Sequence, residues 1–240
     1  MTFLLIILFS FCLPNFQYDE SSEKLNLLLS TYVDSVGNVN YDGIINNPFA
    51  LNDYLQFIKH ISPDSRPEYF KSEDSKKAFW INAYNAVILK LLIDNPGQNI
   101  LDIGLFGHDV FFKTFKIGYK NISPFYIENK ILRKLNDPRI HFAINCGSKS
   151  CPPLGNKILI EKNLDKQLEE KASNFINNPA NVYIDYESKK IYVSRIFKWF
   201  KKDFGNLKKY LSQYLKNDRY DDIKNFKIIY LDYNWAINTK

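Results

Sequence analysis

The sequence has 240 residues, of which 45% are hydrophobic, with 19 Phe, 16 Tyr and a formal net charge of +6. This length and composition suit one domain with a large core, and only 9 Gly and 10 Pro argue against a fibrous or disordered chain. Basic residues gather only between Lys198 and Lys224, where acidic residues interrupt them, which favours a solvated helix face over nucleic-acid binding.

The chain opens with an apolar run of about a dozen residues between Phe3 and Leu13, too short to span a bilayer comfortably. Its length is typical of a signal-peptide core, so we expect residues 1–17 to be a signal peptide. The mature protein would then be extracytoplasmic, either periplasmic or secreted. The run lacks a preceding basic residue and a small-residue cleavage site, so lipid anchoring at Cys12 and an uncleaved anchor or buried strand are the alternatives.

Helical periodicity dominates the first half of the chain. The strongest signal covers residues 73–95, where apolar side chains surround most of the circumference, so we expect a central and buried helix. Asn95, Pro96 and Gly97 end it. The same spacing and capping signals predict further helices over residues 22–36, 48–61, 123–135 and 163–177, and a long helix pair over 195–217.

Strand signals are short and come mostly as hairpins. Hairpins are predicted over residues 111–122 and 182–193, and a last strand over 227–233. Helices followed by hairpins indicate an α+β fold, in which a helical N-terminal part packs on a small antiparallel sheet in a single globular domain. No repeat or flexible linker divides the chain, and we assign residues 18–70 to a helical N-terminal extension and 71–240 to the main domain.

The segment 141–153 concentrates the residues that can do chemistry. Residues 139–145 begin just before this segment and overlap its start. They alternate between apolar and other side chains, which predicts a half-buried strand. That strand would present His141 and Asn145 on one face and would end in a Cys-Gly turn at Cys146.

Several long motifs follow one another along the main domain. They are Phe79 to Ala86, Glu128 with Ile131 to Arg133, His141 to Pro153, Phe197 to Gly205, and Asp232 to Asn238. Together they resemble the domain of unknown function 547 family over residues 70–240. The resemblance implies a family whose bacterial members are often exported and for which no activity is settled.

An enzyme-like polar pocket around His141 and Cys146 is the leading functional hypothesis, and a thiol nucleophile is its first version. Cys146 would attack a carbonyl carbon, and His141 or His108 would accept its proton. Asn145, Asn82 or Glu128 would orient the base. The reaction would be hydrolysis or transfer of an acyl or amide group. In an unbroken strand, however, residues 141 and 146 face opposite sides about 16 Å apart, so a direct pair requires a sharp break of the chain.

The two cysteines also support a structural role. In an oxidising compartment, Cys146 and Cys151 would form a disulfide that closes a short loop, worth about 2 kcal/mol in the chain-entropy model. The protein would then be a non-catalytic binding domain of the envelope or the extracellular space. A zinc site from His141, Glu128 and both cysteines is weaker, because structural zinc sites favour a second Cys pair. A redox dithiol favours Cys-x-x-Cys, so no metal or cofactor is expected.

Buried amides are the next candidates. Asn82 and Asn85 lie one turn apart on the apolar helix 73–95, where their amides must find hydrogen bonds. With Asn145 they are candidates for substrate binding, or they hold the loop that follows Cys146.

The remaining candidates are aromatic or acidic. Trp199 and Trp235 are most simply core aromatics, whereas Asp203 caps or pairs locally, with a role at the site suggested by the resemblance. Glu128, if it is buried near His141, would raise the pKa of that histidine. The expected partner is an unknown small molecule or peptide rather than nucleic acid, with membrane contact only through a lipidated N-terminus.

Overall fold

The computed structural model describes residues 15–240. Residues 1–14 of the predicted signal peptide, with Cys12, lie outside the described residues, and residues 15–17 belong to the first helix. Within the described part of the chain, no helix is both long enough and apolar enough to cross a bilayer.

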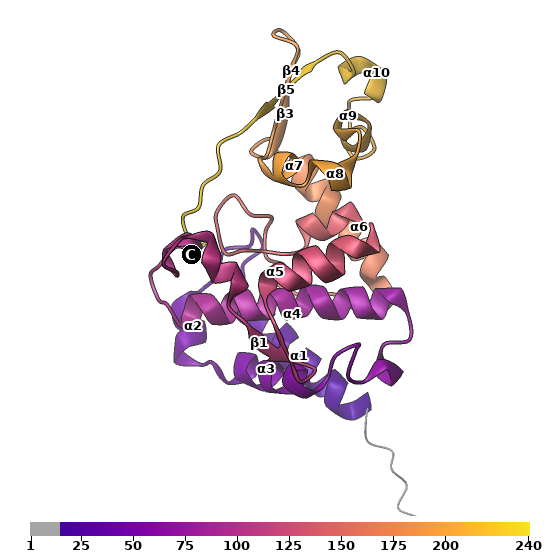
Figure 1. Ribbon diagram of the computed structural model, residues 1–240. Helices are drawn as coiled ribbons and strands as arrows, with labels where there is room; N and C mark the ends of the chain where they lie inside the picture. The colour runs from indigo at the N-terminus through magenta and orange to yellow at the C-terminus, as the bar shows by residue number, and fades with distance from the viewer. Residues whose placement is uncertain (1–14) are drawn as a thin grey trace, which may run out of the picture.

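Helices form most of the lower half of the molecule (Figure 1). The α-helices are α1 (Asn15–Tyr32), α2 (Tyr41–Asn46), α3 (Phe49–His60), α4 (Glu73–Ile93), α5 (Pro124–Tyr126), α6 (Leu164–Ile176), α7 (Ile196–Trp199), α8 (Lys201–Phe204), α9 (Leu207–Leu211) and α10 (Tyr220–Ile223). Shorter 3-10 turns are η1 (Pro67–Tyr69), η2 (Ile100–Asp102), η3 (His108–Phe112), η5 (Leu132–Leu135), η6 (Pro138–Phe142) and η7 (Glu161–Asn163), and η4 (Ile127–Ile131) is a π-helical turn.

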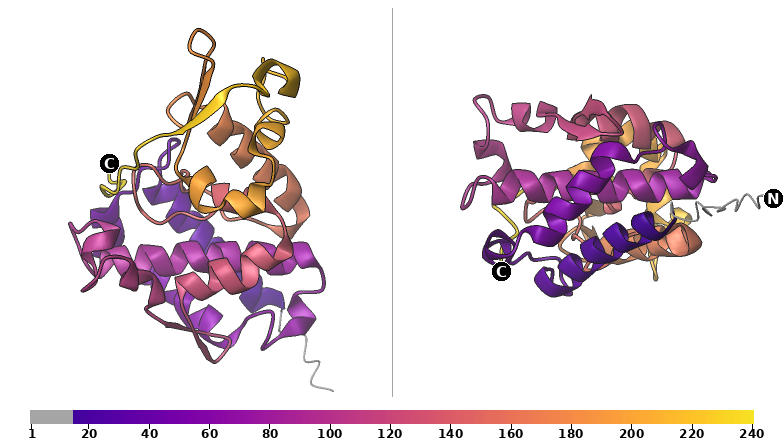
Figure 2. Two further views of the ribbon diagram at one scale, coloured as in Figure 1. Left: turned by 45° about the horizontal axis from the view of Figure 1, so that its top comes forward. Right: turned by 90° about the horizontal axis from the view of Figure 1, so that it is seen from below.

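Helix α4 confirms the predicted central helix. A reciprocal capping box between Ser72 and Ser75 begins it, and acidic residues in its first turn complement the helix dipole. Apolar side chains are buried on all faces of this helix. Helices α2 and α3 pack directly on α4, and α1 packs on α3, as the views in Figure 2 show.

The strands form two small sheets. They are β1 (Phe115–Ile117) and β2 (Lys120–Ile122), which pair as a hairpin, and β3 (Val182–Asp185), β4 (Lys190–Val193) and β5 (Lys227–Tyr230), in the order β3-β4-β5. Both predicted hairpins are confirmed. The predicted α+β fold with a small antiparallel sheet is confirmed, and β5, which runs parallel to β4, makes the second sheet mixed. Along the chain, helices α7 to α10 connect β4 to β5. A crossover connection of this kind allows the second strand to run in the same direction as the first.

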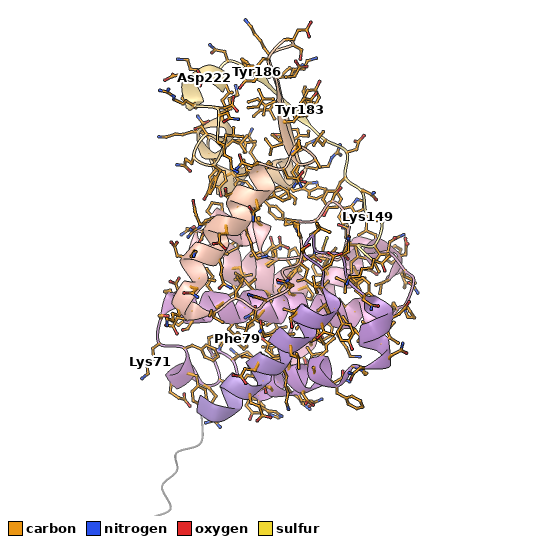
Figure 3. The ribbon with its side chains drawn as sticks, turned by 180° about the vertical axis from the view of Figure 1, so that it is seen from behind. Lys71, Phe79, Lys149, Tyr183, Tyr186 and Asp222 are labelled. Atoms are coloured by element: carbon orange, nitrogen blue, oxygen red, sulfur yellow. The ribbon has the colours of Figure 1, made fainter. Side chains whose placement is uncertain are left out.

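Two clusters of buried side chains form the core. The lower cluster joins α1 to α4, and the upper cluster joins β3 to β5 with α7 to α9. Helix α6 spans both, because Leu168 belongs to the lower cluster and Phe175 to the upper one. Figure 3 shows Phe79 among the lower helices and Tyr183 beside the upper sheet. The region where the two clusters meet holds the candidate site.

The predicted strand over 139–145 is wrong. Residues 138–142 form the 3-10 turn η6, in which the Ala143 N–H donates to the Ile140 carbonyl at 2.9 Å. All residues from 140 to 148 are buried, since this segment lies between the two clusters. The alternating sequence therefore reflects burial on both sides and not one buried strand face.

Two predicted helices differ from their expected bounds. Helix α1 ends at Tyr32 instead of residue 36, because Val33 pairs with Val39 across a turn at Gly37. The long helix pair over 195–217 is three short helices, with breaks at Phe200 and at Gly205.

Replacing Gly37 by Ala should destabilise the fold more than the same change at Gly97. Both glycines have positive φ, +89° and +75°, which costs an alanine about 1 kcal/mol. At Gly37 the added Cβ would also lie 2.6 Å from Pro153 Cβ, whereas nothing lies within 4 Å at Gly97. Overpacking adds roughly 1–3 kcal/mol. Urea denaturation should therefore give a clearly larger loss for Gly37→Ala, and equal losses would contradict this close packing.

Candidate active site

A cavity of about 510 Å³ lies where the lower helices, the upper cluster and the C-terminal tail meet. Helix α4, the η3 to η4 region, η6, the 144–152 loop, α7 and the tail all contribute to its wall. The lining residues are Tyr84, His108, Phe111, Phe112, Phe125, Glu128, His141, Ile144, Cys146, Cys151, Pro152, Ile196, Trp199, Phe200, Tyr233 and Trp235. Three predicted catalytic residues, Glu128, His141 and Cys146, are therefore brought together at one cavity.

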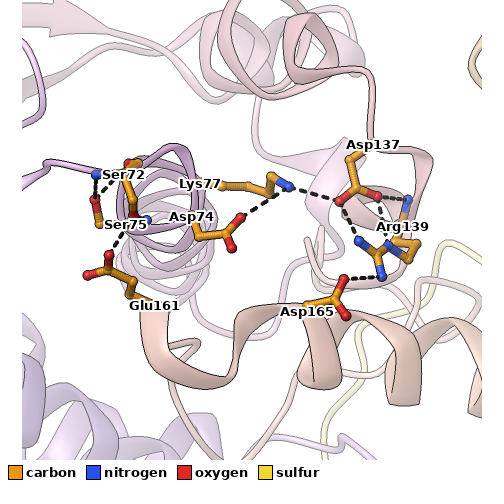
Figure 4. Close-up of polar contacts among 8 residues, drawn as sticks. All are labelled: Ser72, Asp74, Ser75, Lys77, Asp137, Arg139, Glu161 and Asp165. Atoms are coloured by element: carbon orange, nitrogen blue, oxygen red, sulfur yellow. Dashed lines mark hydrogen bonds and ion pairs between the residues drawn. The ribbon is translucent and has the colours of Figure 1, made fainter.

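The turn η6 that carries His141 is anchored by ion pairs (Figure 4). Asp137 accepts the Arg139 main-chain N–H at 3.1 Å and binds the Arg139 guanidinium at 2.9 Å. Lys77 of α4 reaches the same carboxylate at 2.9 Å, and Asp165 of α6 binds Arg139 at 2.8 Å. These contacts fix η6 between α4 and α6 and so determine where the His141 ring lies.

One side of the His141 ring is bound to Asp203. His141 Nε2 lies 2.8 Å from Asp203 Oδ2, and Arg133 grips both carboxylate oxygens at 2.6 and 2.7 Å. Burial opposes ionisation of Asp203, but the hydrogen bonds from Arg133 and His141 hold its pKa below the usual value. The carboxylate is therefore charged and accepts the Nε2 proton of the histidine.

The other ring nitrogen of His141 is unpaired. Burial lowers the pKa of His141 to about 4 and outweighs the raising effect of Asp203, so the expectation of a raised pKa is wrong. Phe200 stacks on the ring with 3.9 Å between centroids. With the proton on Nε2, Nδ1 is a bare acceptor, and it finds no hydrogen-bond partner among the described residues. Such a nitrogen can accept a hydrogen bond from a group bound in the cavity.

Glu128 faces this nitrogen from the π-helical turn η4. Its Oε1 lies 3.9 Å from His141 Nδ1. Burial, followed by the nearby negative charge of Cys146, raises the pKa of Glu128 to about 7. A π-turn inside a helix often marks a functional position, and here it brings a carboxyl group that exchanges its proton near neutral pH to the cavity wall.

Cys146 lies in a turn whose polar groups surround its sulfur. Ser148 Oγ is 3.2 Å away and Tyr233 OH is 3.5 Å away, and the two hydroxyl oxygens are 2.8 Å apart. The hydrogen bond from Cys151 is the largest influence; with those from Ser148 and Tyr233 it lowers the pKa of Cys146 to about 6 against the effect of burial. The side chain is therefore a thiolate near neutral pH.

Both thiols of the predicted disulfide are free in the structure. The Cys146 main-chain N–H donates to Cys151 Sγ at 3.0 Å, and the two side chains are hydrogen-bonded. Burial raises the pKa of Cys151 well above its usual value, so it stays protonated beside the Cys146 thiolate. Within the described part of the chain, no group of three or more His, Cys, Asp or Glu residues could hold a metal ion.

The three candidate amides bind main chain rather than the large cavity. Asn82 exchanges two hydrogen bonds with Leu159, at 2.8 and 3.0 Å. Asn85 donates to the Ala143 carbonyl at 3.0 Å and accepts the Asn145 N–H at 2.9 Å. Asn145 in turn donates to Pro152 O at 2.8 Å and accepts the Gly147 N–H at 2.7 Å. These amides hold the cysteine loop in place.

The C-terminal tail closes the site, a role that the sequence patterns did not predict. The tail runs from β5 down to the lower helices (Figure 1) and pairs with the cysteine loop, where Lys149 N–H donates to Ala236 O at 2.8 Å. It brings Tyr233 to the sulfur and Trp235 to the cavity wall. Trp199 was expected in the core, yet it is half-exposed at the same wall. The tail motif, rich in aromatic residues, was the available signal.

Comparison with known proteins gives one match. The model of a family described as "Protein of unknown function, DUF547" matches residues 68–176, which include Glu128, His141 and Cys146. No curated protein and no solved structure matches the sequence.

The acidity of Cys146 can be measured by alkylation. With iodoacetamide, the rate at Cys146 should rise about tenfold per pH unit and level off above about pH 6, because only the thiolate reacts. Peptide mass spectrometry should find Cys151 unmodified. Cys151→Ala removes the strongest donor and should shift the midpoint upward. A midpoint near pH 9 in the unmodified protein would contradict the proposed thiolate.

Glu128→Gln should reveal the raised pKa of Glu128 through stability. Between pH 4.5, the usual value, and about 7, the folded protein keeps a proton that the unfolded chain has lost, so the contribution of Glu128 to stability falls as pH rises. The variant lacks this loss. Its free energy of unfolding relative to the parent should therefore rise by up to about 3 kcal/mol between pH 4 and pH 8. Exposed Glu170→Gln is the control, and a pH-independent difference would refute the shift.

Proposed function

We propose that this chain, which belongs to the DUF547 family, is a thiol-dependent enzyme that hydrolyses or transfers acyl groups. The observation that carries the proposal is the Cys146 sulfur, which lies among the polar groups of Ser148 and Tyr233 on the wall of a cavity that also holds Glu128 and His141. A nucleophile, a neutral acid and a free base in one apolar cavity are the parts that acyl transfer requires.

The first step forms a covalent intermediate. Cys146 Sγ attacks the carbonyl carbon of an ester, thioester or amide and forms a C–S bond. As the bond to the leaving group breaks, the leaving group takes a proton from the neutral carboxyl of Glu128, whose pKa of about 7 suits this role. The product is a thioester on Cys146, and Glu128 is left as a carboxylate.

The second step regenerates the thiolate. Water, or an alcohol or amine in a transferase, attacks the thioester carbonyl and gives its proton to His141 Nδ1, from which it returns to Glu128. The carboxylate 3.9 Å from Nδ1 and Asp203 at Nε2 both stabilise the transient imidazolium. The C–S bond then breaks, and Cys146 leaves as a thiolate with its hydrogen-bond donors already in position.

A second candidate is a non-catalytic binding domain. The large aromatic cavity supports it, because such a cavity holds an apolar ligand without any chemistry. The two candidates differ in one product, the acyl-thioester at Cys146.

The test is to trap that product. After the protein reacts with p-nitrophenyl butyrate and is quenched in acid, mass spectrometry should find one butyryl group on Cys146, and Cys146→Ala should carry none. Asp203→Asn weakens the support of His141 and should slow turnover by roughly 10²–10⁴-fold. Exposed Asp221→Asn is the matched control and should not. Absence of the adduct with every ester tried, or an adduct on another residue, would refute the proposal.

A further inference from the structure

We infer that the group held in the cavity is an uncharged hydrocarbon, a medium-length aliphatic acyl chain. The inference rests on the proposed function where the hydrocarbon is an acyl group that reacts. It rests on the cavity alone where the hydrocarbon is only bound. Among the described residues that line the cavity, none is Lys, Arg, Asp, Asn, Gln, Ser or Thr. The polar side chains at the wall are Tyr84, His108, Glu128, His141, Cys146, Cys151 and Tyr233, and the remaining lining is apolar.

Anionic ligands are disfavoured by the charges at the wall. A carboxylate or phosphate would lose its hydration on entry and would find no cationic side chain in return. It would also approach the Cys146 thiolate, whose charge already raises the pKa of Glu128. His141 offers no compensating charge, because burial keeps it neutral. The remaining titratable side chains at the wall are His108, Cys151, Tyr84 and Tyr233.

The rings of Trp199, Tyr233 and Trp235 pack against one another and do not form a cage around an empty centre. Aromatic residues that bind an ammonium group surround it, with each ring within about 6 Å of the cation. Here the centroids of Trp199, Tyr233 and Trp235 are only 4.5 to 5.6 Å from one another, so the rings fill the space between them. They form one continuous apolar wall, which a hydrocarbon can cover.

The rim of the cavity continues this apolar surface to solvent. Phe112 and Phe125 stack with 4.5 Å between centroids and are 55% and 37% exposed, and Trp199 is 45% exposed. All three line the cavity. A volume of about 510 Å³ lies within the roughly 300–1,000 Å³ range of small-molecule sites. A hydrocarbon can therefore enter between exposed rings and extend toward Cys146.

The experiment measures the dependence on chain length. With p-nitrophenyl esters from acetyl to octanoyl, kcat/KM should rise about fourfold for each added methylene until the cavity is full, as burial of one CH₂ predicts. Trp199→Ala should lower the octanoyl-to-acetyl ratio of kcat/KM by about tenfold, the loss expected for a poorly filled apolar pocket. Phe49→Ala is the control, because this ring is 73% exposed on α3 and is absent from the cavity wall. A flat series, or preference for a succinyl or choline ester, would overturn the inference.

A binding measurement separates this inference from the proposed function. Cys146→Ala should bind the neutral fluorescent probe N-phenyl-1-naphthylamine, and methyl octanoate should displace it better than methyl acetate. This order of displacement without any acyl-enzyme in the parent protein would support the hydrocarbon site and refute the acyl chemistry. Acylation of the parent protein with no preference for chain length, together with no probe binding, would support the acyl chemistry and refute the hydrocarbon site.

Discussion

Buried main-chain groups must find hydrogen-bond partners, and the cysteine loop over residues 143–151 has no helix or strand of its own to supply them. The partners come from three separate parts of the chain. Asn85 of the central helix binds the start of the loop, Asn145 binds across it, and the tail pairs with its far side through Ala236. The position of the Cys146 sulfur follows from these contacts, and therefore so does every interaction that the sulfur makes.

The positions of protons at the site follow from burial and from a few fixed donors. Burial alone would leave all four groups uncharged. Arg133 keeps Asp203 ionised, and the donors around Cys146 keep its sulfur ionised. At Glu128 burial outweighs the charge of Arg133, and at His141 burial outweighs the contact with Asp203, so both groups favour the neutral form. The resting site thus holds a nucleophile and an acid whose pKa values, about 6 and about 7, lie close together. Groups matched in this way can exchange a proton at low cost.

Helix α4 could be predicted from the sequence because its periodicity and its caps agree. Glu128, His141 and Cys146, which were grouped as a chemical hypothesis, line the same cavity in the structure. The turn η6 could not be predicted. The alternating pattern of its sequence is typical of a strand, but here it arises because the segment is buried between two clusters. In the structure, the ion pairs of Asp137 with Lys77 and Arg139 hold the turn in place. A sequence pattern shows that a segment is buried. It does not show whether the segment packs against one neighbouring layer or between two.

The predicted strand placed the side chains of residues 141 and 146 on opposite faces, and this obstacle disappears because the segment is a turn. In an extended strand their side chains would point to opposite sides, but the compact η6 turn and the bend that follows let both face one cavity. The remaining element, Tyr233, comes from a part of the chain more than eighty residues away. A hydrogen bond over such a separation forms only when the tail is docked. The thiolate is thus a property of the complete fold, and a free cysteine in the unfolded chain would have its usual pKa.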